Sequence, residues 1–301
     1  MRHLLTFQLI EAVARAGSIR RAAEDMNLTA SALTRRIIRF EEDFGAAIFE
    51  RVPGGVRLNP AGELLLHHYR VMQSDLSRVQ GQVADLSGVR RGHVSIACSQ
   101  ALLPYFLPQQ IAEYRAEHPG VSFAVNVRDR TEAEQELASY SSDLALVFEP
   151  LYLVDFEVIQ IVPQPVCAIL QAGHPLAQKK EIRLRDCLEW PHIAPTAEYG
   201  VRYLLDNAAR RNLRKLTPVV ETESFELIRH YVRHENVIGF QIPIGLRDQA
   251  GDGLVFRKIS DKDLQPGNLI LGQKRGRTLP VASARFAVQI ATALEGFAYP
   301  E

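Results

Sequence analysis

The chain has 301 residues, of which 47% are hydrophobic and 23% are charged, and this composition predicts a globular protein with two or three domains. The formal charge is zero, and residues 1–91, with 13 arginines against 10 acidic residues, carry an excess too small to argue for or against a nucleic-acid partner. Three widely spaced cysteines without a CxxC pair argue against a disulfide framework or a zinc site. Charged residues interrupt every apolar run long enough for a signal peptide or a membrane helix, so we expect a cytoplasmic protein without a membrane partner.

Residues 1–59 show three helical patterns followed by a hairpin pattern. The first apolar stripe stops at Gly17, Ser18 can cap a second helix, and Thr29 can cap a third. The buried stripe of the third helix is predicted to be Leu33, Ile37, Phe40 and Phe44. Two short strand patterns flank residues 53–55, Pro-Gly-Gly, which form a turn. Three helices and a hairpin predict an N-terminal winged helix-turn-helix DNA-binding domain.

A long fourth helix is predicted to begin after Asn59, with Pro60 at its first position. Its apolar residues alternate in steps of four and three: Leu65, Tyr69, Met72, Leu76, Val79, Val83 and Leu86. This heptad seam lies on a rod of about 42 Å and is typical of a helix that pairs with a second chain. The alternative is a helix that lies on its own domain. We predict a dimerisation linker over residues 60–88 and a hinge over residues 89–92.

Beyond the hinge, strand patterns alternate with helix patterns. Such alternation predicts an α/β domain over residues 93–301, layered around a largely parallel sheet. We expect two sub-domains, the first formed by about 93–162 and 268–301 and the second by about 163–267.

The outer face of the third helix carries small and cationic side chains. These are Ser31, Thr34 and Arg35, with Ile38 farther along and Arg36 at the flank. A helix with little bulk can enter the major groove, which is about 12 Å wide, and an arginine there can bind O6 and N7 of guanine. Arg20 and Arg21 on the preceding helix, and Arg51 and Arg57 on the hairpin, add cations around the same face. Singly these arginines are ordinary solvated charges, but together they predict a surface for double-stranded DNA.

The segment SIRRAAEDMNLTASALTRRIIRFEEDFGAAIFERVPGGVRLNPAG resembles the N-terminal domain of the LysR-type transcriptional regulators, and the rest of the chain is similar to their effector-binding half. The resemblance implies that Thr29, Ser31, Thr34, Arg35 and Arg36 touch DNA, with Arg51 on the wing. It also implies a periplasmic-binding-protein-like effector domain, a dimer of dimers, and RNA polymerase as a further candidate partner.

Solute-binding folds of this type hold a small molecule between their sub-domains, at strand C-termini and helix N-termini. Residues at such positions here are Ser99, Gln100, Thr131, Phe148, Thr196, Ser224 and Gln241. Their hydroxyl and amide groups, with the adjacent helix N-termini, suit a small carboxylate effector. The alternative is that Ser99, Thr131 and Ser224 only cap helices.

Other chemistry has weaker support in the sequence. His230 and His234 are four residues apart but lack a third metal ligand, and Cys98, which could be a redox sensor, lacks a nearby partner cysteine. No nucleotide-binding or hydrolase motif occurs, so we expect no catalytic residue, metal or cofactor. The sequence predicts an effector-responsive DNA-binding regulator that activates or represses transcription. The alternative is a cytosolic small-molecule-binding protein or enzyme without affinity for DNA.

Overall fold

The computed structural model describes residues 2–86, 91–247 and 253–297 of the chain. They form two compact units, Met1–Leu76 and Ser77–Glu301, and the division falls inside one long helix. Half of the predicted hinge, residues 89–90, lies outside the described residues, while Arg91 and Gly92 belong to the first strand of the second unit. Among the described helices, none combines the length and the apolar composition that a bilayer span needs.

The first unit is a winged helix-turn-helix. Its elements are α1 (Arg2–Ala16), α2 (Ile19–Asp25), α3 (Ala30–Phe44), β1 (Phe49–Val52), β2 (Gly55–Leu58) and the first part of α4 (Pro60–Leu86). Gly17 has a φ of 61° after α1, which a glycine adopts without strain, and Gly45 ends α3 with a φ of 81°. The Ser18 hydroxyl accepts a hydrogen bond from the Arg21 amide, and Thr29 Oγ1 accepts one from the Ala32 amide at 3.2 Å. These contacts confirm the predicted helix breaks.

Two apolar clusters hold this unit together. One contains Leu9, Val13, Leu33 and Ile37, and the other contains Ile10, Phe40, Ile48 and Leu65. Phe44 was predicted to be buried, and this prediction is wrong, because its side chain is 47% exposed. It lies at the last turn of α3, where it stacks on Phe40 at the edge of the cluster.

The start of α4 packs on its own unit. Leu65 and Tyr69 are 8% and 1% exposed, and the Tyr69 ring lies 5.1 Å from that of Phe7. Arg70 Nε also donates to Glu11 of α1 at 2.8 Å. The assignment of Leu65 and Tyr69 to an interchain seam is therefore corrected, because Leu65 is buried with Ile10 and Phe40 and Tyr69 is buried against Phe7 within one chain.

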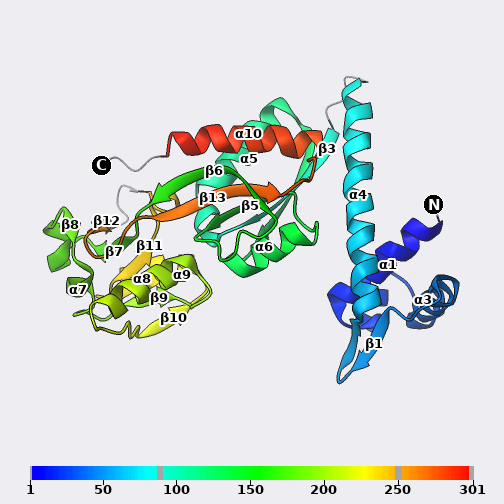
Figure 1. Ribbon diagram of the computed structural model, residues 1–301. Coiled ribbons are helices and arrows are strands. Elements are labelled where there is room, and N and C mark those ends of the chain that lie inside the picture. Colours follow the sequence, from blue (N-terminus) through cyan, green and yellow to red (C-terminus); the bar gives the residue numbers. More distant parts are fainter. Residues whose placement is uncertain (1, 87–90, 248–252, 298–301) are drawn as a thin grey trace. The chain divides into compact units, whose positions relative to one another are not determined.

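The second unit begins with a five-stranded sheet in the order β4-β3-β5-β13-β6 (Figure 1). Its strands are β3 (Arg91–Cys98), β4 (Gly120–Val127), β5 (Leu144–Phe148), β6 (Phe156–Gln164) and β13 (Gly267–Lys274). Helices α5 (Phe106–Glu117) and α10 (Val281–Glu295) cover one face, and α6 (Arg130–Ala138) covers the other. We call this part the first lobe, residues 91–164 and 267–297.

The second lobe comprises residues 165–247 and 253–266. Its four-stranded sheet has the order β11-β7-β12-β8, and a separate two-stranded sheet pairs β10 with β9. The strands are β7 (Cys167–Gln171), β8 (Glu181–Ile182), β9 (Ile193–Pro195), β10 (Val220–Thr222), β11 (Gly239–Gln241) and β12 (Leu254–Ile259). The helices are α7 (Leu184–Cys187), α8 (Gly200–Arg211) and α9 (Phe225–His234), with α9 packed on β7, β9 and β11.

The two larger sheets are mixed, so the prediction of a largely parallel sheet is wrong. Strands β3, β4 and β5 run parallel, but β13 is antiparallel to both β5 and β6. The chain leaves the first lobe along β6 and returns along β13, so these neighbours must run in opposite directions. The two segments that connect the lobes, after β6 and before β13, both lie at the boundary between the lobes.

Candidate DNA-binding surface and effector crevice

The outer face of α3 is open to solvent. Ser31 and Arg35 are exposed, Thr34 and Arg36 are partly exposed, and Ile38 lies on the same side. The Thr34 hydroxyl donates to the Ala30 carbonyl at 2.8 Å, which fixes its orientation. The predicted recognition residues of this helix therefore share an accessible, mostly polar face.

Thr29 has a structural role in addition to its predicted contact with DNA. Its hydroxyl caps α3 through the Ala32 amide and lies 3.3 Å from the Ser31 hydroxyl. A side chain engaged in this way presents only its remaining hydrogen-bonding capacity to a ligand.

The predicted phosphate-binding arginines lie on α2 and the hairpin of the same unit. Arg20 pairs with Glu24 at 3.1 Å, and Arg57 pairs with Glu50 across the hairpin. Arg21 and Arg51 are exposed. Because exposed ion pairs are weak, about 0–1 kcal/mol, these guanidinium groups can exchange their carboxylate partners for phosphates.

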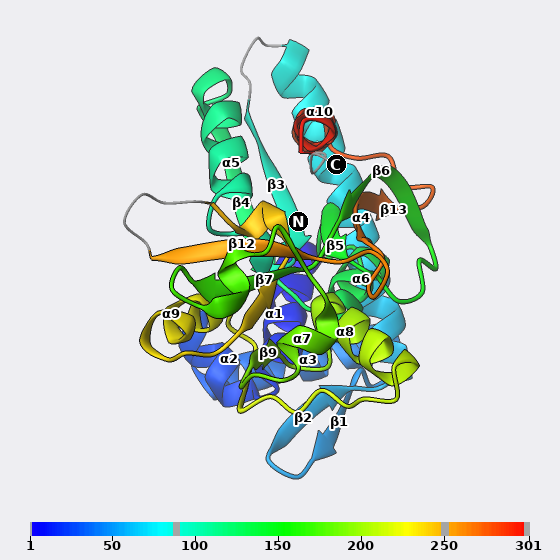
Figure 2. The ribbon, with the colours of Figure 1, turned by 90° about the vertical axis from the view of Figure 1, so that its left-hand side faces the viewer.

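The wing is held firmly against the helices from which it protrudes (Figure 2). The Val56 amide donates to the Gly17 carbonyl at 3.0 Å, and a Cβ at Gly55 would overlap that carbonyl. The Glu41 carboxylate of α3 accepts hydrogen bonds from the amides of Ile48, at 2.8 Å, and Phe49. The strand that carries Arg51 is therefore positioned directly by the recognition helix.

The exposed part of the heptad seam begins after Tyr69. Leu76, Val79 and Val83 are 44%, 45% and 56% exposed, whereas Met72 is partly buried. Leu86 belongs to α4, but its side chain lies outside the described residues. The central part of α4 thus presents an apolar stripe that the described part of the chain leaves exposed to solvent.

In the second unit, Gln100 joins the two lobes. It lies in a short 3-10 turn, Gln100–Leu102, directly after β3, and its Oε1 accepts a hydrogen bond from the Phe225 amide at 2.5 Å. Phe225 is the first residue of α9, where the unpaired amides and the helix dipole favour an acceptor or an anion. A side chain of the first lobe therefore occupies the helix N-terminus of the second.

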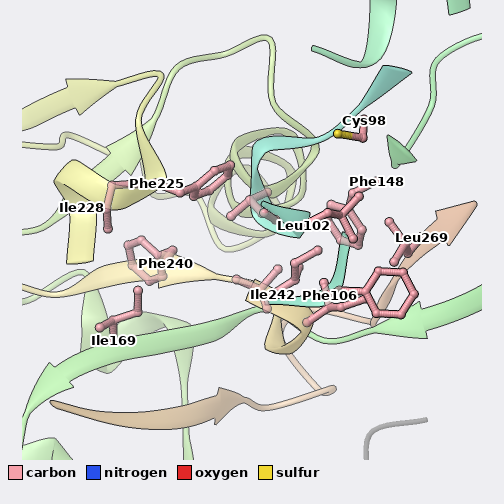
Figure 3. Packing of buried hydrophobic residues seen from close by; sticks show 14 of the residues in the cluster. Cys98, Leu102, Phe106, Phe148, Ile169, Phe225, Ile228, Phe240, Ile242 and Leu269 are labelled. Atoms are coloured by element: carbon pink, nitrogen blue, oxygen red, sulfur yellow. The ribbon is translucent and has the colours of Figure 1, made fainter. Parts of the chain in front are cut away.

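Among the described residues, side chains of the two lobes pack closely against one another. Phe148 packs so tightly against Gly200 and Gly267 that a Cβ at either glycine would overlap it. Figure 3 shows Phe225, Ile228 and Phe240 of the second lobe near Leu102, Phe106 and Phe148 of the first, all within one buried cluster. The hollow beside Gln241 and Arg229 has a volume of about 10 Å³, which holds at most one water molecule.

The other predicted effector residues differ in their roles. Ser224 caps α9 by accepting a hydrogen bond from the Leu227 amide at 3.1 Å, whereas Ser99 makes no capping bond. Gln241 is buried and accepts from the Ile242 amide. Within the described part of the chain, the buried Thr196 hydroxyl has no hydrogen-bond partner.

The suggestion that Thr131 caps its helix is wrong. Asp129 is the cap of α6, because its carboxylate accepts the amides of both Thr131 and Glu132 at 2.8 Å. Thr131 is the second residue of the helix, so its hydroxyl is not needed for capping.

Two buried arginines at the crevice were not predicted. Arg130 lies over the Tyr203 ring at 4.4 Å and donates to the Glu149 carbonyl, and burial lowers the pKa of its guanidinium. Arg229 donates to the Tyr105 hydroxyl of the first lobe. A signal for Arg229 was present, because it falls on the apolar face of α9 together with Phe225.

Neither cysteine chemistry nor metal chemistry has support in the geometry. Cys98 is fully buried, and burial raises the pKa of its thiol to about 12, so it is protonated and unreactive at neutral pH. His230 Nε2 pairs with Glu226 at 2.8 Å on the surface of α9. Among the described residues, no group of three or more side chains could hold a metal ion.

A winged helix-turn-helix with a cationic recognition face, followed by a two-lobed α/β unit, defines a DNA-binding regulator with an effector-binding domain. Family models agree: the lysR family of bacterial regulatory helix-turn-helix proteins matches residues 4–63, and the LysR substrate binding domain matches residues 87–295. The chain belongs to the LysR family of transcriptional regulators and is not an enzyme.

Named relatives are regulators as well. The chain is 30% identical to the transcriptional activator protein LysR of Escherichia coli strain K12 over 263 residues, which cover 86% of this chain and 83% of that protein. It is 26% identical to the HTH-type transcriptional activator CmpR of Synechocystis over 75% of this chain and 74% of that protein.

Solved structures share the fold. A full-length OxyR variant from Pseudomonas aeruginosa matches with a TM-score of 0.71 at 17% identity, covering 97% of this chain and 94% of that one. CbnR in complex with its target DNA matches with a TM-score of 0.66 at 14% identity, covering 96% and 99%.

Proposed function

We propose that this regulator binds its operator through the outer face of α3, the start of α2 and the wing. The surface comprises Arg20, Arg21, Thr29, Ser31, Thr34, Arg35, Arg36, Arg51 and Arg57. It is supported by the exposure of the arginines and by the fixed position of the wing, and the structure of CbnR was solved with target DNA. Because its target is DNA, we propose that the regulator acts in the cytoplasm.

The exposed seam of α4 supports pairing between two chains. Leu76, Val79 and Val83 follow heptad spacing on one face, and a second copy of the helix is the partner that such spacing fits. Two paired chains would present two recognition helices to successive major-groove faces, about 34 Å apart or a multiple of that distance. We propose a dimer formed in this way and a dimer of two such dimers.

The effector is a small carboxylate that binds between the lobes. The observation that supports this class is the 2.5 Å contact of Gln100 with the Phe225 amide, because a carboxylate is a stronger acceptor at a helix N-terminus than a neutral amide oxygen. The effector-binding domain of QuiR, which shares the fold with a TM-score of 0.60, was solved in complex with shikimate.

Binding requires a change in the lobes. Because Gln100 occupies the start of α9, an effector that binds the Phe225 amide has to displace this side chain, and we propose that the lobes separate as it does so. A ligand that binds the separated state better shifts the population toward it, and the change in lobe closure would alter the packing of the assembled subunits.

Thermal unfolding of the full-length protein tests the effector class. Ligands that bind the folded state raise the melting temperature, so a panel of small carboxylates is compared with the primary amides of the same acids. We expect at least one carboxylate, and not its amide, to raise it. Equal stabilisation by acid and amide, or by neither across the panel, would contradict the proposal.

A Gln100→Ala variant sharpens this test. Removing the amide oxygen leaves the Phe225 amide without this acceptor, which costs about 1 kcal/mol of folding free energy, and it also removes the group that competes with the effector. The variant should melt lower than the wild type and bind the active carboxylate more tightly. Gln178→Ala, at an exposed position of the second lobe, is the control that should change neither quantity.

A further inference from the structure

The outer face of α3 contains one aliphatic side chain among polar ones. Ile38 is 47% exposed and does not belong to either apolar cluster described for this unit. It follows Thr34 by four residues and Ser31 by seven, so all three lie on the same side of the helix. Packing within the unit does not account for an isoleucine at this position.

Helix propensity does not account for it either. A β-branched residue is a poorer helix former than alanine, arginine or glutamine at an exposed position. Ile38 therefore presents an apolar group to the molecule that contacts this face.

The chemistry of the side chain restricts what it can recognise. Isoleucine has no donor and no acceptor, so it can bind neither a phosphate nor the hydrogen-bonding edge of a base. In the major groove, the apolar group that distinguishes one base from the others is the 5-methyl group of thymine. Ile38 lies about 10 Å along the helix axis from Ser31, so it faces a different base pair.

We propose that Ile38 is a specificity-determining residue that recognises the 5-methyl group of one thymine in each half of the operator. The proposal rests on the DNA-binding surface proposed above. Arg35, one turn earlier, and Ile38 would then read neighbouring base pairs by different means, a bidentate hydrogen bond in one case and an apolar contact in the other.

The test begins with the full-length protein and a library of random DNA duplexes, from which bound sequences are selected and sequenced. In the resulting consensus duplex, each dT is replaced singly by deoxyuridine, which removes only the methyl group. Wild-type affinity should fall about fourfold at one thymine per half-site, which corresponds to about 0.8 kcal/mol for one buried methyl group.

The variant Ile38→Ala should bind the dT and deoxyuridine duplexes equally at that position. Alanine is a better helix former than isoleucine, so this exposed substitution should not unfold α3. Val288→Ala, an exposed valine of α10, is the matched control and should keep the full fourfold difference.

A uniform response of the wild type to deoxyuridine, an undiminished difference in Ile38→Ala, or a selection without any enriched sequence would each overturn the proposal. Failure of the underlying surface has a different signature. If that surface is wrong, Arg35→Ala binds with wild-type affinity and selects the same consensus.

Discussion

Arg35 and Arg51 of the winged unit are exposed, whereas Arg130, Arg229 and Arg277 of the second unit are 8%, 6% and 8% exposed. The buried arginines have partners that folding has already provided. Arg277, for example, donates to the Ser142 carbonyl at 2.8 Å and pairs with a buried aspartate. Removing one partner of such a pair is strongly destabilising, whereas an exposed arginine can change partners at little cost.

This difference shows two ways of preparing a binding site. The winged unit presents charges that exchange water and counterions for DNA phosphates without a change in its core. In the second unit, Gln100 instead already occupies the amide at the start of α9, so the effector of the proposed function would replace an internal contact. Affinity in the first case depends on salt, and in the second it depends on the equilibrium between closed and open lobes.

The largest effect is expected from Leu76→Asp. A charge in the exposed seam should prevent pairing of the linker helices, and loss of the second DNA contact should lower operator affinity a hundredfold or more. Sedimentation should show a smaller assembly, and fluorescence anisotropy the lower affinity. Ser77→Asp introduces the same charge outside the seam and should change neither. An undiminished mass for the Leu76 variant would refute the role of the seam.

A smaller effect is expected from Arg35→Ala. Loss of one bidentate contact with guanine is worth about 1–3 kcal/mol, which corresponds to a roughly 5- to 150-fold weaker operator complex and a lower ratio of specific to nonspecific affinity. Arg185→Ala, an exposed arginine of the second lobe, is the charge-matched control. If the Arg35 variant and the wild type bind operator and scrambled duplexes with equal affinities, Arg35 does not belong to the proposed DNA-binding surface.

The smallest expected effect is a pH dependence of the stability of the second unit. Burial lowers the pKa of His174, whose Nδ1 accepts a hydrogen bond from the Leu176 amide. Below about pH 6.5 the unfolded chain takes up a proton that the folded state resists, so stability should fall as the pH drops from 7 toward 5.5. The His174 ring contacts Trp190, the chain's one tryptophan, so urea unfolding followed by its fluorescence reports on this region.

His234→Asn, at an exposed histidine, should retain this pH dependence, whereas His174→Asn should reduce it. A wild-type unfolding midpoint that is unchanged between pH 7 and 5.5 would show that His174 does not control stability in this range.

Much of the winged unit could be predicted because its signals are local. Ser18, Thr29 and Gly45 act on amides or dihedral angles within a few residues, so spacing alone identified them. The outer face of α3 could also be predicted, since helical periodicity separates it from the buried stripe. Heptad spacing does not say which chain covers the stripe, and so Tyr69, which packs on its own unit, was assigned to a seam between chains.

The location of the crevice could be predicted from the sequence, but the contacts between its side chains could not. Strand ends and helix starts placed Gln100 and Ser224 near it, yet the partner of Gln100 is 125 residues away and no local pattern encodes that contact. The cap of α6 was missed because Asp129 and Thr131 are both good N-terminal residues, and only geometry shows that the carboxylate reaches the amides. Strand direction near β13 likewise depends on how the chain crosses between lobes.

The glycines that enclose Phe148 have a practical consequence for engineering. A larger residue at Gly200 or Gly267 would clash with Phe148, whereas shortening the Phe148 side chain would open space between these two glycines. Apolar cavities made by shortening a buried side chain stay dry and accept small hydrophobic guests. A biosensor that responds to a chosen aromatic acid would therefore start from a trimmed residue 148, with reporter induction as its readout.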